Sequence, residues 1–212
     1  MKKTIFVFCM LMLTFVNSKA QQQVEPRQSS APEKKNSVLV SGGAFMVSQR
    51  RNAKPIAEFS PAVYVQYNRT IWKGLGISIG YAYKRDDPNA RTINHEKIPS
   101  TEQTHSILFA PNYRFDIKKF NFTPEFAMGV CHANFKLAHV PQGKIKDETT
   151  TFIISPGFRL GYDIDKWDVF LSYHYDYYQH DVGEPQFMRT ANWDFPKSFG
   201  HHCLLVGAGV KF

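Results

Sequence analysis

Ser172, His174 and Asp176 are the residue types of a nucleophilic catalytic site, and they alternate along one stretch of the chain. Alternate residues of a β-strand point to the same face, so the three side chains would share one surface. Neighbours on that face lie about 6.6 Å apart, whereas a nucleophile and its base need hydrogen-bond contact at about 3 Å. A productive pair would therefore need a residue from a neighbouring strand, and we predict a polar face here rather than a catalytic site.

Histidine is the other residue type with metal chemistry. The eight histidines are His95, His105, His132, His139, His174, His180, His201 and His202. They are scattered over several predicted strands and loops, without the short local spacing of zinc ligands. Polar residues around one end of the fold are therefore favoured over a metal site, and we predict no cofactor.

Cys131 and Cys203 fall on predicted strands that are three strands apart. Neighbouring strands are spaced about 4.8 Å apart, and a disulfide needs Cα atoms within about 7 Å of each other. We therefore predict two free, buried thiols. A single disulfide across the interior is the alternative.

A strict two-residue alternation runs through most of the chain and predicts β-strands. The clearest stretch places Trp167, Val169, Leu171, Tyr173, Tyr175 and Tyr177 on one face, and Asp168, Ser172, His174 and Asp176 on the other. Phe170 is the exception to this pattern. Eight such stretches cover roughly residues 38–48, 57–67, 74–84, 103–115, 120–135, 149–162, 167–178 and 199–212. Most of them reach the ~9–11 residues that a tilted strand needs to cross a bilayer.

The large apolar face must point outward, because an eight-stranded barrel has an interior just wide enough for side chains. The opposite face offers Gly, Ala, Ser and a few charges, which fit. A soluble barrel with an apolar interior would need the reverse polarity. An outward apolar band is stable only against lipid or a second protein layer. We therefore predict an all-β fold, an eight-stranded antiparallel up-and-down transmembrane β-barrel.

The inward positions carry side chains that we predict to form a lumen polar network, namely Arg114, Glu125, Arg159, Asp168, His174 and Asp176. Lys84 and Lys211 share this parity. Charges in a narrow lumen pair with one another and hold the barrel shut. A narrow gated conductance is the alternative, since a small barrel lacks space for a wide channel.

Short and long connections alternate along the chain. Residues 68–73, 116–119 and 163–166 form the predicted short turns, and residues 49–56, 85–102, 136–148 and 179–198 the long loops. This asymmetry is typical of the periplasmic and extracellular ends of outer-membrane barrels. Pro61, Pro111, Pro124 and Pro156 fall on outward positions inside predicted strands, where we expect bulges or bends.

The first 20 residues are typical of a cleaved secretory signal peptide. Two lysines precede an apolar stretch from Thr4 to Val16, and small residues stand three and one positions before a cut after Ala20. The stretch is too short to span a bilayer as a helix, and a short N-terminal anchor is the alternative. Residues 21–36 are polar and without periodicity, which predicts a flexible periplasmic leader. Residues 37–212 form the predicted barrel.

The formal net charge is +8 at pH 7, and the predicted signal peptide carries three of these charges. The remaining charge is spread along the chain without a basic block. We therefore predict no nucleic-acid site.

The last predicted strand ends in an aromatic residue. Gly207, Val210 and Phe212 match the Gly-x-x-apolar-x-aromatic core of the terminal signal of outer-membrane barrels, although the polar residue usual before the glycine is absent. With the strand number and the loop asymmetry, residues 37–212 resemble small outer-membrane β-barrel proteins of the OmpA/OmpX type. The resemblance implies a place in the bacterial outer membrane, contact with its lipid, and recognition of the C-terminal strand by the barrel-assembly machinery.

We predict a structural or surface-interaction role with the long loops facing outward, because such loops carry contacts while one fold hosts several functions. The loop at 179–198 is the candidate for an extracellular ligand, with Tyr177, Tyr178, Phe187, Trp193 and Phe195 in or beside it. These aromatics are equally typical of an interface belt. A narrow porin-like channel is the first alternative. A lipid A-modifying barrel enzyme is the second, but the chain lacks the His-x-Ser pair of such deacylases, and we predict no enzyme.

Overall fold

The computed structural model describes residues 35–47, 59–87, 89–91, 97–140, 143–182 and 198–212. All regular structure in these ranges is β-strand. These ranges therefore contain no helix that could cross a membrane. The predicted signal peptide and leader lie outside the described residues except for Lys35 and Asn36. Both segments stay predictions.

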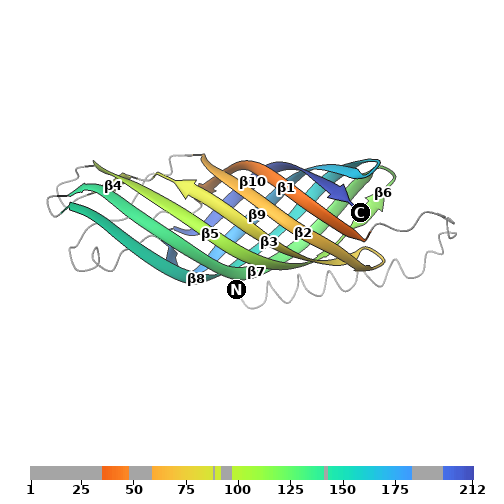
Figure 1. The fold of residues 1–212 in the computed structure, drawn as a ribbon, viewed down its shortest axis with the longest axis horizontal. Coiled ribbons are helices and arrows are strands. Elements are labelled where there is room, and N and C mark those ends of the chain that lie inside the picture. Colours follow the sequence, from red (N-terminus) through yellow and green to blue (C-terminus); the bar gives the residue numbers. More distant parts are fainter. Residues whose placement is uncertain (1–34, 48–58, 88, 92–96, 141–142, 183–197) are drawn as a thin grey trace, which may run out of the picture. The chain divides into compact units, whose positions relative to one another are not determined.

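Eight antiparallel strands form one closed barrel, as predicted (Figure 1). They are β1 (Asn36–Val47), β2 (Ser60–Trp72), β3 (Leu75–Asp86), β5 (Lys97–Tyr113), β7 (Phe120–Val140), β8 (Gly143–Ile164), β9 (Trp167–Val182) and β10 (Ser198–Lys211). Each pairs with the strand before and after it, and the pairing of β1 with β10 closes the ring.

Two short strands, β4 (Asn89–Arg91) and β6 (Phe115–Ile117), add to these eight without changing the ring. β4 pairs with the start of β5. β6 continues β5, because Phe115 pairs with Phe122 in the same register in which Phe109 pairs with Met128. That register sets Pro124 opposite Tyr113, and the missing N–H of the proline accounts for the break between β5 and β6.

The barrel wall has the polarity that the alternation predicts. Outward side chains such as Ile107 and Val206 are 64% and 67% exposed, whereas inward ones such as Ser155 and Ser172 are 0% and 1% exposed. Phe170, the exception to the alternation, points into the lumen and is buried. The apolar band therefore covers the outside of the barrel.

Three two-residue turns join the strands at one end, called here the turn end. Lys73-Gly74, Lys118-Lys119 and Asp165-Lys166 form these turns. Each contains a backbone in the left-handed region, at Lys73 (φ 38°), Gly74 (φ 87°), Lys118 (φ 59°) and Asp165 (φ 53°). Such positive φ values match the twist of a tight hairpin. The predicted turns were too long, because strand pairing continues to within one residue of each tip; β2, for example, extends to Trp72 rather than ending near residue 67.

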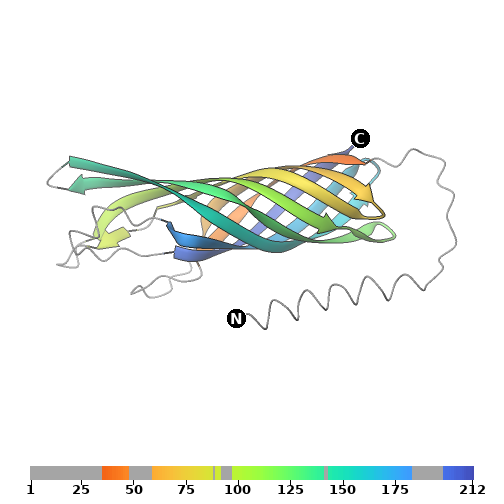
Figure 2. The same ribbon diagram turned by 90° about the horizontal axis from the view of Figure 1, so that it is seen from below.

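The opposite end, called here the loop end, has longer strands than predicted. β7 and β8 pair as far as Val140 and Gly143, so the predicted loop at 136–148 is mostly a hairpin that extends past the other strands (Figure 2). Likewise β3 reaches Asp86 and β5 begins at Lys97 within the predicted loop at 85–102. Many of these residues are polar, but ladder hydrogen bonds form regardless of side-chain polarity. The loop at 49–56, and that at 179–198 beyond Val182, lie outside the described residues.

The four strand prolines leave the register intact. Pairing across Pro61, Pro124 and Pro156 continues in β1–β2 and β7–β8 without an inserted residue. The β5–β7 ladder keeps one register on both sides of Pro111. The register shifts of the described strands fall at Thr70–Trp72, Leu137–Val140 and Ser198–Gly200 instead. The predicted bulges at the prolines are therefore wrong, because each proline removes a donor locally but adds no residue. The alternative, bends at the prolines, stays a prediction.

Candidate functional site

The lumen holds three groups of charged side chains, and the first surrounds Arg114 at the turn end. Arg114 stands at the break between β5 and β6, where its main-chain N–H donates to the Gly74 carbonyl at 2.8 Å. Its guanidinium contacts the carboxylates of Asp163 at 2.6 Å, Asp168 at 2.9 Å and Asp116 at 2.7 Å. Planar guanidinium groups suit such multiple pairing. Arg114 thus lies at the break in the strand and binds three acidic side chains.

Asp163 also binds the last strand of the barrel. The Lys211 ammonium lies 2.7 Å from its carboxylate, so β10 is joined to β8 through an ion pair. Asn121 completes this group by donating to Asp168 at 3.0 Å. Asp163 was predicted to lie in a turn, without a role in the lumen.

Glu125 is the centre of the second group, halfway along the barrel. Its carboxylate lies 3.5 Å from an Arg159 nitrogen and 3.3 Å from Nδ1 of His174. The Gln66 amide donates to Glu125 at 3.4 Å and accepts from Arg159 at 3.3 Å. The Arg159 guanidinium also lies over the Phe170 ring, 5.8 Å from its centroid.

Asp176 is the centre of the third group, nearer the loop end. It forms an ion pair with Lys84 and accepts hydrogen bonds from Ser155 and, at 3.1 Å, from the Tyr64 hydroxyl. Lys84 donates to the Tyr178 hydroxyl at 3.1 Å. The Tyr64 ring stacks on His174 with centroids 5.5 Å apart, which links the second and third groups.

These contacts cross the full width of the barrel. β3, which carries Lys84, and β9, which carries Asp176, are four strands apart in either direction around the ring. The same separation holds for β2 and β8, which carry Gln66 and Arg159. The Lys84 and Asp176 side chains are 1% and 0% exposed, so no water-sized space remains beside them. A lumen bridged in this way is filled by side chains.

All six predicted lumen residues lie inside the barrel, but direct contacts do not join them in one set. Arg114 contacts Asp168, and Glu125 contacts both Arg159 and His174. Asp176 contacts Lys84 instead of another of the six. Three further lumen residues were not predicted from the sequence. Tyr64 links the second and third groups, Gln66 belongs to the second group, and Tyr178 belongs to the third.

Tyr178 does not belong to the predicted aromatic loop site. It is 0% exposed and binds inside the lumen, while Tyr177 points outward and is 45% exposed. The parity of β9 carries the signal, because Tyr178 follows His174 and Asp176 on the inward face. Phe187, Trp193 and Phe195 lie outside the described residues.

Ser172, His174 and Asp176 do not form a catalytic set. The Ser172 hydroxyl has no hydrogen-bond partner within the described part of the chain, and His174 faces Glu125. Asp176 is engaged by Lys84. A nucleophile with no base in reach cannot be activated.

The described histidines and cysteines do not gather at one site. His105 and His202 point outward and contact Tyr81 at 2.6 Å and Tyr173 at 2.7 Å, whereas His201 contacts Tyr178 in the lumen at 3.0 Å. Among the described residues no three His, Cys, Asp or Glu side chains are placed to hold a metal. His95, His139 and His180 lie outside the described side chains. Cys131 and Cys203 are free and buried, as predicted.

Gly207, Val210 and Phe212 of the predicted insertion signal lie at the end of the barrel strand β10 and just after it. Phe212 is 56% exposed, and its main chain exchanges two hydrogen bonds with Asn36, at 2.9 and 3.1 Å. Close packing also favours glycine at position 207. A Cβ there would lie 2.5 Å from both the Phe170 ring and the Val40 carbonyl oxygen.

Comparisons with known proteins agree with this architecture. No protein-family model and no curated protein matches the sequence. Among solved structures, Ail, the attachment invasion locus protein of Yersinia pestis, matches with a TM-score of 0.58 and 13% identity over 85% of this chain and 100% of its own. Neisserial surface protein A matches with a TM-score of 0.55 and 14% identity, over 84% of this chain and 97% of its own.

A major outer membrane protein of Thermus thermophilus matches with a TM-score of 0.55 and 10% identity, over 84% of this chain and 99% of its own. The chain has the fold of the small outer-membrane β-barrels. At these identities the likeness concerns the fold, and it confirms the resemblance inferred from strand number and loop asymmetry.

Proposed function

We propose that the protein is a barrel of the bacterial outer membrane that serves surface interaction, with its turn end in the periplasm and its loop end outside. The outward apolar band requires an apolar solvent, and the likeness in fold to outer-membrane barrels supports lipid as that solvent. Short turns at one end and long extensions at the other support the orientation.

The pair of Lys84 and Asp176 is the observation that favours this function over a channel. It spans opposite walls of the lumen with both side chains buried. An ion would have to separate this pair, and separating a buried ion pair is strongly unfavourable. The lumen therefore stabilises the barrel rather than conducting ions.

Recording in planar lipid bilayers tests this choice. We expect the purified, refolded barrel to give no unitary current steps at neutral pH, under conditions in which a sixteen-stranded porin conducts. Stable unitary steps that depend on the amount of this protein would reject the closed lumen and favour the narrow channel.

The β7–β8 hairpin is the described part of the surface best suited to a ligand. Lys136 and Lys146 are direct partners across it, and both are exposed. Like charges directly opposite one another destabilise a hairpin, so a bound anion would relieve their repulsion. Ail of Yersinia pestis has been solved in complex with the heparin analogue sucrose octasulfate, in a structure that matches this chain with a TM-score of 0.55. We infer that the hairpin attracts sulfated or phosphorylated polymers.

Calorimetric titration with sucrose octasulfate tests this ligand class. We expect binding that weakens with salt, and a loss of affinity in K136Q/K146Q. The matched control K35Q/K73Q removes two exposed lysines at the turn end and should bind as the wild type does. Equal loss in both variants would contradict a site on the hairpin.

The proposal includes removal of residues 1–20 during secretion and a periplasmic leader before β1. The layout of positive, apolar and small residues supports it. N-terminal sequencing of the protein from the membrane fraction should begin at Gln21, and a chain that retains its first residues would contradict it.

A further inference from the structure

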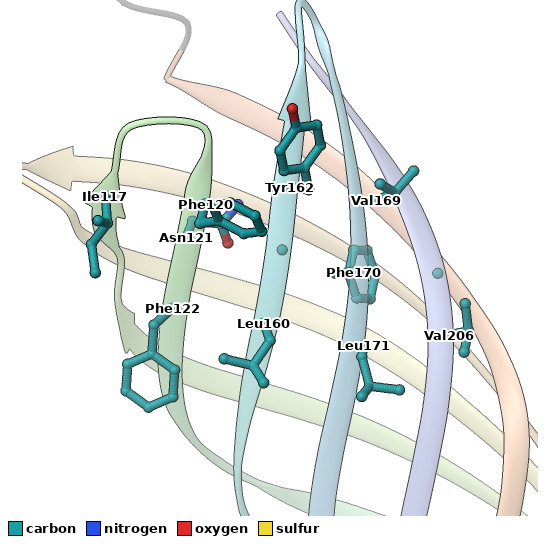
Figure 3. A pocket seen from close by; sticks show the side chains of 12 residues that line it. Ile117, Phe120, Asn121, Phe122, Leu160, Tyr162, Val169, Phe170, Leu171 and Val206 are labelled. Carbon is teal, nitrogen blue, oxygen red and sulfur yellow. The ribbon is translucent and has the colours of Figure 1, made fainter.

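A hollow of about 650 Å³ lies on the outer face of the barrel near the turn end, across the strands β7 to β10 (Figure 3). The hydrogen-bond register explains its shape. Phe122, Leu160, Leu171 and Val206 are successive partners across the four strands and form one row of outward side chains. Phe120, Tyr162 and Val169 form a second row two residues away.

The floor between the two rows is main chain. Asn121, Gly161, Phe170 and Gly207 are partners on the rung between them, and their side chains, where present, point into the lumen. Rows two residues apart along a strand are separated by about 6.6 Å. The hollow is thus a trough bounded by apolar side chains, and we call it the β7–β10 trough.

One end of the trough meets a pair of lysines. Ile117 and Phe120 line it, and they flank the turn formed by Lys118 and Lys119. The Asp163 main-chain N–H donates to the Lys119 carbonyl at 2.7 Å, which holds this turn against β8 beside Tyr162. The Asp163 carboxylate does not neutralise the two lysines, because Arg114 and Lys211 bind it inside the lumen. Both lysines are exposed.

We propose that the β7–β10 trough and the Lys118-Lys119 turn bind one anionic phospholipid of the periplasmic leaflet. An acyl chain would lie in the trough, and the headgroup phosphate would pair with the two ammonium groups. Strands of such barrels tilt by about 35–45°, so a trough that crosses them runs obliquely from the edge of the membrane toward its interior. A phospholipid has the same arrangement, with its charge at the membrane edge and its chain inward. The site rests on the proposed function, since the turn end must lie in the periplasmic leaflet.

Native mass spectrometry of the refolded barrel in detergent, titrated with dioleoyl phosphatidylglycerol, tests the proposal. We expect the wild type to retain one lipid at low lipid concentration and to prefer it to dioleoyl phosphatidylcholine. K118Q/K119Q should bind phosphatidylglycerol about thirtyfold more weakly, since each of the two lysines near an anionic lipid contributes about 1 kcal/mol. L171W, which adds bulk to the side of the trough, should also weaken binding.

Two matched variants control for charge and bulk. K35Q/K73Q removes two exposed lysines from the turn end near β1 and β2, and I79W adds a tryptophan at the outward Ile79 of β3. Both should bind as the wild type does. Equal weakening in K118Q/K119Q and K35Q/K73Q would overturn the site, because the lipid would then respond only to overall charge. A dimer that L171W disrupts would assign the trough to a second copy of the chain and overturn the proposal.

Membrane insertion is measured separately, so the two proposals can fail separately. A wild-type barrel that inserts into liposomes yet retains no anionic lipid would overturn the trough site alone. A chain that stays soluble without detergent and ignores liposomes would overturn the proposed function and the trough site together.

Discussion

Asp176 receives contacts from several walls of the barrel at once. Tyr64 of β2, Lys84 of β3 and Ser155 of β8 all reach it from their own strands. The Cys203 thiol also donates to it at 3.5 Å. Because the carboxylate is fully buried, its charge depends on such partners. The position therefore ties the strands together across the lumen.

Removing one member of the Lys84–Asp176 pair should be more harmful than removing both. K84M or D176L alone leaves an unpaired buried charge, and we expect each to lower the free energy of unfolding by about 3–5 kcal/mol. The double variant K84M/D176L should lose clearly less than the sum of the two. Urea unfolding of the barrel in liposomes, followed by tryptophan fluorescence, measures all three. Additive losses would mean that the two side chains do not interact.

Parity in the sequence leads to the charged lumen residues, but not to the groups that join them. Arg114, Glu125 and Asp168 stand out because a charge on a short alternating stretch is rare. Tyr64 and Tyr178 have inward parity, but they carry no charge that would set them apart from the many outward aromatics of this chain. The partner of Asp176 follows only from the closure of the barrel, which sets β3 opposite β9.

The last strand is fixed at its end by contacts to two other strands. Phe212 exchanges main-chain hydrogen bonds with Asn36 of β1, and Lys211 forms an ion pair with Asp163 of β8. The ring of Phe212 is exposed and contributes little to this closure. Removal of the ring alone can therefore test its role in recognition without a large effect on stability.

We predict that F212A folds in detergent like the wild type but reaches the outer membrane severalfold less well in cells. The reason is that barrel-assembly machinery would lose the terminal aromatic, while the main-chain bonds to Asn36 stay. Heat-modifiable protein in the membrane fraction measures assembly, and F59A, at another exposed phenylalanine, is the control. Unimpaired assembly of F212A would refute the insertion signal.

The end of the β7–β8 hairpin should be dispensable for the barrel. β8 pairs with β9 only from Ile153 onward, so the tip of the hairpin is mostly a two-stranded ribbon. Phe135 and Asp147 are partners in the ladder. An Asn-Gly turn in place of residues 136–146 should therefore close a shorter hairpin.

We expect this shortened chain to unfold within about 1 kcal/mol of the wild type, because isolated ribbons are marginally stable. It should lose sucrose octasulfate binding. Urea unfolding and calorimetry measure the two effects, and a barrel that no longer folds would show that the hairpin is part of the fold.

Strand bodies follow from the sequence more accurately than strand ends. Apolar alternation marks the part of each strand that faces lipid, and it finds all eight. Pairing continues past that part, to Trp72 at the turn end and to Val140 at the loop end, where polar residues stay in the ladder. Main-chain hydrogen bonds hold the strand ends without an alternating apolar pattern in the sequence, so the ends could not be predicted.

The whole molecule combines an apolar outside with a paired polar inside. This polarity is the reverse of that of a soluble domain, and it is stable only when lipid surrounds the wall. The cross-lumen pairs fill the interior with side chains, and the proposed function accordingly lies at the ends and on the outer surface. Proteins of similar fold carry different functions, so the function of this protein depends on the residues at its surface.

Gel mobility of the membrane fraction tests whether the protein is a closed barrel inserted in the outer membrane. Outer-membrane protein prepared in sodium dodecyl sulfate should migrate as a compact species when unheated and more slowly after boiling. The compact form persists because the closed ladder leaves no strand edge where unfolding can begin. A protein found in the soluble fraction, with the same mobility before and after boiling, would show that it is not such a barrel.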